Sequence, residues 1–215
     1  MGNAIVRVGK YDMKAIDLFS GLGGFSRGFL ESGWSLERYD NDEQFRSIPH
    51  TTIKDVFSIE RVDADVIVAS PPCEAFSVAA FGHHWEPGYV PATKHADMSI
   101  RLVRHTLDII KESEPVFWVM ENPRGMLRKI IGMPQRETWW CRWGDDRAKP
   151  TDLWGVFPPS LDFPPRCKNN NPDCHHQRAR RGAKTGTQSR KGPAERALIP
   201  IQFSRALSDA CERHL

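Results

Sequence analysis

Three short groups of residues in the first 123 positions carry side chains that could do chemistry. The first, DLFSGLGG at residues 17–24, is rich in glycine, which lets a backbone turn tightly and approach a ligand closely. The second is Pro-Pro-Cys at residues 71–73, in which a thiol follows two rigid prolines. The third is Glu-Asn-Pro at residues 121–123, which supplies a carboxylate. Such groups could bind a cofactor, act as a nucleophile and move a proton.

The glycine-rich group follows a short apolar run, residues 14–19, and precedes a segment of helical character, residues 25–32. A strand that turns into a helix in this way presents backbone amides to a ligand. Asp40 lies about 20 positions further on, where an acidic residue can hold ribose hydroxyls. No Gly-Lys-Ser/Thr sequence follows, which disfavours a Walker-type phosphate site. A plain tight turn is the alternative interpretation.

The thiol and the carboxylate each follow an apolar, β-branched run. Cys73 comes shortly after residues 65–69, and Glu121 comes directly after residues 116–120. A thiolate is the reactive form of cysteine, and an ordinary cysteine titrates near ~8.5. An idle buried thiol and a solvated carboxylate are the alternatives. The shared position at strand ends favours a common site.

The elements that must position these groups alternate along the chain. Strands are expected at residues 14–19, 34–39, 51–53, 65–69, 116–120 and 137–143, and helices at residues 25–32, 97–112 and 198–214. This alternation predicts an α/β fold with a doubly wound, mostly parallel sheet, whose ligands bind at the carboxyl ends of the strands. All three groups, and Asp40, fall at such ends.

The composition is that of a soluble globular protein, with 40% hydrophobic and 27% charged residues among 215. No apolar run approaches the ~20 residues of a membrane span, and no leader segment is recognisable. We therefore expect a cytoplasmic protein without membrane contact, and a monomer by default. Five scattered cysteines argue against a disulfide framework.

The order of these motifs resembles that of the cytosine-C5 DNA methyltransferase family over roughly residues 13–160. The resemblance implies a Rossmann-like fold that binds S-adenosylmethionine and releases S-adenosylhomocysteine. The cofactor-binding residues that it implies are Asp17, Phe19, Gly21, Gly23, Gly24, Asp40, Asn41, Asp55, Val56 and Pro71. Among them, Asp40 would hold the ribose, and Asn41, Asp55 and Val56 would border the adenine.

The resemblance also implies roles in catalysis. Cys73 would attack carbon 6 of a flipped-out cytosine, and Glu121 would bind the N3 side of the ring. Arg142, on a strand expected at Trp140–Trp143, is the candidate arginine for contact with the base. Residues 74–95 would form a mobile loop that closes over the base.

Two positions depart from the family pattern, since Glu74 stands where glutamine is usual and Pro123 where valine is usual. They leave open a non-catalytic or altered-specificity nucleic-acid-binding protein of the same fold. A cytosine methyltransferase acting on RNA also remains open. An amino-group methyltransferase is a further alternative, although such enzymes place an aromatic residue where this chain has Cys73.

The segment of residues 164–193 is strongly basic, with eight Lys or Arg residues against one acid, Asp173. Such a segment can neutralise DNA phosphates. It also contains Cys167, Cys174, His175 and His176. Thiolates and imidazoles suit zinc, for which Cys141 is a further candidate ligand, and unligated side chains are the alternative. A structural zinc would order a segment too polar to bury a core of its own.

These observations divide the chain into two parts. We expect a catalytic methyltransferase domain formed by residues 1–143 and 194–215, and a small basic target-recognition segment at residues 144–193. The implied partner is DNA. Restriction–modification, phage self-protection and independent methylation all stay open as roles.

Overall fold

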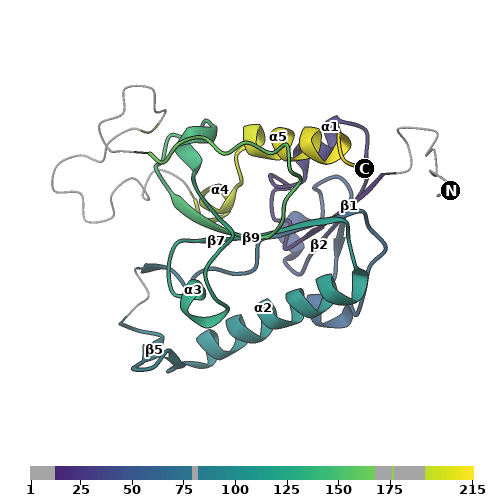
Figure 1. Cartoon of the computed structure of the whole chain (residues 1–215). Helices are drawn as coiled ribbons and strands as arrows, with labels where there is room; N and C mark the ends of the chain where they lie inside the picture. Colours follow the sequence, from purple (N-terminus) through teal and green to yellow (C-terminus); the bar gives the residue numbers. More distant parts are fainter. Residues whose placement is uncertain (1–12, 79–81, 168–175, 177–191) are drawn as a thin grey trace, which may run out of the picture.

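A computed structural model describes residues 13–78, 82–167, 176 and 192–215. Its centre is a seven-stranded sheet in the order β3-β2-β1-β4-β7-β9-β8 (Figure 1). The strands are β1 (Lys14–Leu18), β2 (Ser35–Asp40), β3 (Thr51–Ile53), β4 (Val66–Ala69), β7 (Phe117–Pro123), β8 (Arg136–Trp139) and β9 (Pro150–Val156). The five neighbouring strands β3, β2, β1, β4 and β7 pair in parallel, so the expected doubly wound, mostly parallel sheet is confirmed.

Helices cover both faces of the sheet, with α2 on one side and α1 and α5 on the other (Figure 1). The helices are α1 (Arg27–Glu31), α2 (Lys94–Ser113), α3 (Leu127–Ile130), α4 (Pro193–Ala197) and α5 (Ile201–Glu212). Short 3-10 turns occur at η1 (Glu43–Phe45), η2 (Val56–Ser58) and η4 (Trp140–Trp143). Each face buries its own apolar cluster, one around Phe29 and Phe203 and the other around Ile67 and Met120. The sheet is therefore buried on both sides, as parallel strands require.

The helix α2 begins three residues before the expected 97–112 segment. Thr93 adopts an extended conformation and its hydroxyl accepts a hydrogen bond from the Ala96 amide at 3.2 Å. This capping bond satisfies one of the free amides of the first turn and sets the start of the helix. Its buried positions include Ile100, Val103 and Ile110, as the helical spacing predicted.

The backbones of helices α1 and α5 approach each other very closely. The Gly28 amide donates to the Ser204 hydroxyl at 2.7 Å, and this hydroxyl donates to the Phe25 carbonyl at 2.6 Å. A side chain on Gly28 would meet the backbone of Ser204 at 2.4 Å. Glycine is therefore required for the contact that binds the C-terminal helix to the start of the chain.

The antiparallel side of the sheet differs from the sequence expectation. The strand expected at residues 137–143 ends at Trp139, and Trp140–Trp143 forms the 3-10 turn η4, so the placement of Arg142 on a strand is wrong. Gly144, whose φ is 92°, lets the chain reverse there while Trp140 and Trp143 are buried. The chain then forms β9, which was not expected and which lies between β7 and β8.

The position of β9 bears on the expected division of the chain. Its residues 150–156 fall within the segment 144–193, yet they pair with both β7 and β8 in the central sheet. Any separate recognition segment therefore starts after Val156.

Within the described residues, none of the helices combines the length and the apolar composition that a membrane span requires.

Candidate active site

A pocket of about 360 Å³ lies at the carboxyl ends of β1, β2 and β4. Six of the residues implied for cofactor binding line it, namely Asp17, Phe19, Gly21, Gly24, Asp40 and Asn41. Its volume falls within the roughly 300–1,000 Å³ of small-molecule sites. The glycine-rich turn and the acidic end of β2 therefore meet around one cavity, as the sequence predicted.

The turn is fixed by bonds to the end of β2. The Gly21 amide donates to Oδ2 of Asp40 at 2.8 Å, and the Ser20 amide donates to the Tyr39 carbonyl at 3.1 Å. Phe19 and Gly21 have φ angles of 61° and 50°, in the left-handed region that glycine tolerates best. Asp40 is thus held at the pocket wall with lone pairs still available to a ligand.

Four other implied residues do not line this pocket. Gly23 lies against the guanidinium of Arg38, which would stand 2.6 Å from an added side chain. Asp55 caps η2, in which Val56 lies, by accepting from the Phe57 amide at 3.0 Å. Pro71 contributes its carbonyl, to which the side chain of Asn122 donates at 3.1 Å. The last bond ties the Cys73 segment to the strand that carries Glu121.

The pocket has further lining residues beyond those implied for cofactor binding. They are Ser20, Leu22, Phe25, Asp42, Phe45, Ser70, Pro72, Glu74, Ala194, Ala197, Leu198 and Ile199. The last four come from the C-terminal segment around α4. An added side chain on Gly24 would meet Leu198 at 2.5 Å, so this segment packs directly on the glycine turn. No local sequence signal reveals such a long-range wall.

Three buried polar atoms around the pocket lack a hydrogen-bond partner within the described part of the chain. They are Oδ1 of Asp17 and the hydroxyl oxygens of Ser20 and Ser70. Buried polar atoms are rarely left unsatisfied, because each costs roughly 1–3 kcal/mol. A ligand with amino, carboxylate and hydroxyl groups, such as S-adenosylmethionine, fits these atoms together with Asp40.

Asp17 is fully buried at the end of β1. Burial raises the pKa of Asp17 to about 7, although the hydroxyl of Ser26 and the charge of Arg38 lower it. Ser26 donates to this carboxylate at 2.6 Å and accepts from Nε of Arg38 at 2.8 Å. One oxygen of Asp17 therefore binds Ser26 in the glycine-rich turn region, and the other lies at the pocket without a hydrogen-bond partner among the described residues.

Cys73 lies four residues after β4, beside the pocket wall formed by Pro72 and Glu74. Burial raises the pKa of the Cys73 thiol to about 11, and the negative charges of Glu121 and Glu74 add to this effect. The positive charge of Lys149 opposes it. The thiol is therefore protonated at neutral pH when the site holds no substrate.

Residues 74–95 begin in the core and contain a short hairpin, β5 (Trp85–Glu86) and β6 (Val90–Pro91). Ala75 and Phe76 are fully buried, and the indole of Trp85 donates to the Ala75 carbonyl at 2.7 Å. The Met126 amide donates to the Phe76 carbonyl at 2.7 Å, which joins the start of this segment to α3. The segment expected to close over the base is thus anchored near Cys73.

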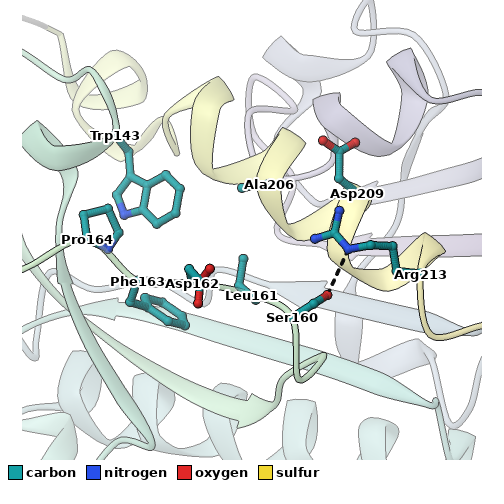
Figure 2. Close-up of a pocket in the computed structure, with 9 residues that line it drawn as sticks. All are labelled: Trp143, Ser160, Leu161, Asp162, Phe163, Pro164, Ala206, Asp209 and Arg213. Carbon is teal, nitrogen blue, oxygen red and sulfur yellow. Dashed lines mark hydrogen bonds between the residues drawn. The ribbon is translucent and has the colours of Figure 1, made fainter.

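A second hollow, of about 430 Å³, lies between α5 and residues 160–164 (Figure 2). It is lined by Trp143, Ser160, Leu161, Asp162, Phe163, Pro164, Ala206, Asp209 and Arg213. Arg213 donates to the Ser160 hydroxyl at 3.1 Å. No motif residue lines this hollow, so it is not the candidate active site.

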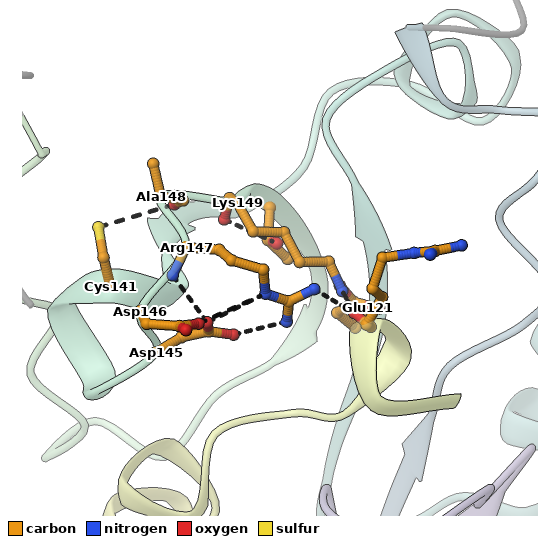
Figure 3. Close-up of polar contacts among 9 residues, drawn as sticks. Glu121, Cys141, Asp145, Asp146, Arg147, Ala148 and Lys149 are labelled. Atoms are coloured by element: carbon orange, nitrogen blue, oxygen red, sulfur yellow. Dashed lines mark hydrogen bonds and ion pairs between the residues drawn. The ribbon is translucent and has the colours of Figure 1, made fainter. Parts of the chain in front are cut away.

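Glu121 lies within β7, opposite Leu153 of β9, because β7 extends past the expected 116–120 segment. Its carboxylate is buried, and burial raises its pKa above the ordinary value while Lys149 lowers it. Nζ of Lys149 lies 3.6 Å from Oε1 of Glu121 (Figure 3). The same ammonium donates to the Arg196 carbonyl at 3.2 Å. Lys149 was not indicated by the motifs, and it reaches the site because β9 pairs with β7.

The residues before β9 form a compact polar turn. The guanidinium of Arg147 binds the Asp145 carboxylate at 2.7 Å and donates to the Arg196 carbonyl at 3.2 Å (Figure 3). Arg147 and Lys149 thus hold one carbonyl of α4 between them. This contact links the wall of the pocket to the side of Glu121.

The residues implied for zinc are only partly described. Cys141, Cys167 and His176 place their ligand atoms within 4.8 Å of one another. Cys174 and His175 lie outside the described residues, as do most basic residues of the 164–193 segment.

The doubly wound sheet, its glycine-rich turn, and the thiol and carboxylate at its carboxyl edge define a Rossmann-like methyltransferase fold. Residues 13–133 match the model of the C-5 cytosine-specific DNA methylase family. The chain belongs to this family, as the order of its motifs predicted.

Individual relatives agree with this assignment. The type II methyltransferase M1.HphI of Haemophilus parahaemolyticus is 31% identical over 139 residues, which cover 57% of this chain and 35% of that protein. A probable DNA (cytosine-5)-methyltransferase of Frog virus 3 is 26% identical over 217 residues, which cover 93% of this chain and 100% of the viral protein. The chain thus spans about a third of the bacterial relative and all of the viral one.

Among solved structures, the Entamoeba histolytica methyltransferase EhMeth aligns with a TM-score of 0.45 and 14% identity. The alignment covers 73% of this chain and 57% of that one.

Proposed function

We propose that this chain transfers a methyl group from S-adenosylmethionine to carbon 5 of cytosine in DNA through a covalent bond to Cys73. The observation that carries the proposal is the joining of the Cys73 segment to the Glu121 strand, beside a pocket with unsatisfied buried polar atoms. Family membership supports the same chemistry.

The cofactor would occupy the pocket at the carboxyl ends of β1, β2 and β4. Asp40 would bind the ribose hydroxyls, and Phe19 and Asn41 would border the purine. The free oxygen of Asp17 and the Ser20 hydroxyl suit the polar amino-acid end. When bound, S-adenosylmethionine supplies the electrophilic methyl group.

Glu121 and Cys73 would act as a proton-coupled pair. The raised pKa of Glu121 favours its protonated form, which can donate to N3 of the base. Transfer of that proton to the base makes carbon 6 more electrophilic. Cys73 loses its proton to solvent and adds to carbon 6, which makes carbon 5 electron-rich. Methylation of carbon 5 would release S-adenosylhomocysteine. Loss of the carbon-5 proton to solvent, departure of Cys73 as a thiolate and return of the N3 proton to Glu121 would then restore the ring.

Lys149 would limit how far the pKa values of Glu121 and Cys73 rise. Its ammonium lies 3.6 Å from Glu121 and lowers the pKa of both Glu121 and Cys73. We propose Lys149 as a cation on the base side of the site, in addition to Arg142. Double-stranded DNA would have to release the cytosine from its stack, at a cost of a few kcal/mol. The basic segment 164–193 would bind the phosphates.

The test is transfer of tritiated methyl groups from S-adenosylmethionine to double-stranded DNA, followed by digestion to nucleosides. We expect 5-methylcytosine from the unsubstituted chain and no product from Cys73→Ala. Cys211→Ala is the matched control, since Cys211 is buried on α5 away from the pocket. Turnover retained by Cys73→Ala would sink the nucleophile assignment. Recovery of N4-methylcytosine or N6-methyladenine would favour the amino-group alternative.

A competition assay distinguishes the nucleic-acid substrates. Unlabelled RNA should leave DNA methylation unchanged, whereas RNA that becomes labelled would favour the RNA alternative. Binding of DNA without any transfer, by a chain that also binds S-adenosylmethionine, would favour the non-catalytic alternative.

A further inference from the structure

Two buried thiols and an imidazole meet beside η4, away from the pocket. Cys141 lies in η4, and Cys167 follows the loop after β9. Their sulfur atoms and a ring nitrogen of His176 all lie within 4.8 Å of one another. Cys141 is 0% and Cys167 is 8% exposed. Three soft donors from three separate positions in the sequence thus converge on one point.

The spacing within this cluster suits a metal ion. The distance from Sγ of Cys167 to Nδ1 of His176 is 3.6 Å. Tetrahedral zinc, with bonds of about 2.3 Å to sulfur and about 2.0–2.1 Å to nitrogen, sets its sulfur and nitrogen ligands about 3.6 Å apart. A thiol-to-imidazole hydrogen bond has a similar length, but it does not call for a second sulfur at the same point. The Cys141 sulfur provides that third donor.

Charge balance favours a divalent ion in this cluster. Two thiolates and one neutral imidazole carry a charge of −2, so bound Zn²⁺ leaves a neutral group that can be buried. Positive charge also lies near the cluster, since the guanidinium groups of Arg124 and Arg166 are each 4.8 Å from the centre of the neighbouring Trp139 ring.

We propose that Cys141, Cys167 and His176 bind one structural Zn²⁺, with the remaining tetrahedral position taken by a fourth donor. All three were candidate ligands in the sequence, whereas Cys174 and His175 lie outside the described residues. The ion would fix the start of the basic segment to the corner between β8 and β9. This proposal does not depend on the proposed methyl transfer.

The ion would also support the site indirectly. Cys141 adjoins Trp140 in η4, and Lys149 contacts Glu121. The Trp140 amide donates to the Lys149 carbonyl at 3.2 Å. A metal ion at Cys141 would therefore hold the turn that delivers Lys149.

The primary experiment is the metal content of the full chain after purification in reducing buffer and dialysis. We expect one zinc per chain, and a loss of at least 80% of it in His176→Ala, because one of three ligands is missing. The matched control is His214→Ala, an exposed histidine after α5, which should keep one zinc. Zinc absent from the unsubstituted chain, or equal in the two histidine variants, would overturn the proposal.

A second measurement covers the possibility that cysteine variants fail to fold. Replacement of zinc by Co²⁺ should produce thiolate-to-cobalt charge-transfer absorption in the near ultraviolet, which weakens in Cys141→Ser and Cys167→Ser but not in Cys211→Ser. Absence of this band overturns the thiolate ligands. Loss of two titratable thiols in the denatured, unreduced protein would also overturn them, because it indicates a Cys141–Cys167 disulfide. Since these readouts need neither DNA nor S-adenosylmethionine, they are separable from failure of methyl transfer.

Discussion

The charges of Glu121 and Lys149 control the reactivity of Cys73 in opposite directions. Burial and the Glu121 carboxylate raise the pKa of the thiol to about 11, and the Lys149 ammonium lowers it. A protonated thiol is a weak nucleophile, so the raised pKa slows alkylation and oxidation of Cys73. Neutralising Glu121 removes part of this protection. Under the proposed function, Glu121 would be in this neutral form before its proton passes to N3.

Alkylation of Cys73 should therefore respond oppositely to two substitutions. In Glu121→Gln the pKa of Cys73 falls, so iodoacetamide labelling at pH 8 should be several-fold faster than in the unsubstituted chain. In Lys149→Met the pKa rises, and labelling should be slower. Peptide mass spectrometry would measure the rate, with Cys211 as the internal reference. Equal rates at Cys73 in both variants would contradict the electrostatic account.

Asp17 should give folding stability a dependence on pH. Burial raises its pKa from 3.8 to about 7, so the folded chain binds this proton more tightly than the unfolded chain. Its contribution is present below about pH 4 and is lost as the pH rises through about 7. Asp17→Asn should flatten this part of the urea-midpoint profile, whereas Asp108→Asn, at an exposed position on α2, should leave it unchanged. An unchanged slope in Asp17→Asn would rule out the assignment.

At the scale of elements, several features could be predicted because short stretches of sequence determine them. They are the glycine-rich turn, the positions of Cys73 and Glu121, and the five parallel strands. The strand β9 could not be predicted. Pro150, Asp152 and Gly155 are residue types that strands disfavour. Tertiary contacts overcome this preference, since Arg128 pairs with the buried Asp152 and Gly155 approaches the backbone of Trp118.

The same limitation explains why Lys149 and the placement of Arg142 were not predicted correctly. Lys149 reaches Glu121 only because β9 pairs with β7, a contact between segments about thirty residues apart. A strand with alternating side chains was expected through Trp143, but Gly144 with its φ of 92° ends the run in a turn. Both features depend on backbone geometry that short patterns do not encode.

Contact between α1 and α5 should be sensitive to a single methyl group. Gly28→Ala places a carbon 2.4 Å from the Ser204 backbone, so the helices must separate. We expect a loss of about 1–3 kcal/mol in the free energy of unfolding, measured by urea denaturation. Gly82→Ala is the control, because nothing lies within 4 Å of its added carbon. If the two variants were equally stable, the close approach would not matter for stability.

At the scale of the whole molecule, the pocket is assembled from three distant stretches of chain. Residues 17–25, residues 70–74 and residues 194–199 all contribute to its wall. The first two carry recognisable motifs, and the third does not. The pocket therefore depends on the docking of α4 and α5 as much as on the glycine-rich turn.

A bulky side chain on that wall should block the pocket. Ala197 is exposed on α4 and lines the pocket, so Ala197→Trp should raise the Kd for S-adenosylmethionine at least tenfold without lowering stability. Isothermal calorimetry would measure the Kd. Asp108→Trp adds the same ring on the exposed side of α2 and should leave the Kd unchanged. Unchanged affinity in Ala197→Trp would place the cofactor elsewhere.

The docking of α5 on α1 has a consequence for the time at which the protein becomes competent during its synthesis. Gly28 and Ser204, which bond directly, are 176 positions apart. A growing chain on the ribosome can form β1 and the glycine-rich turn early, since domains fold progressively from the N-terminus. It cannot close the pocket until residues 194–204 have emerged. Under the proposed function, a ribosome stalled before this point should display a nascent protein that retains no S-adenosylmethionine.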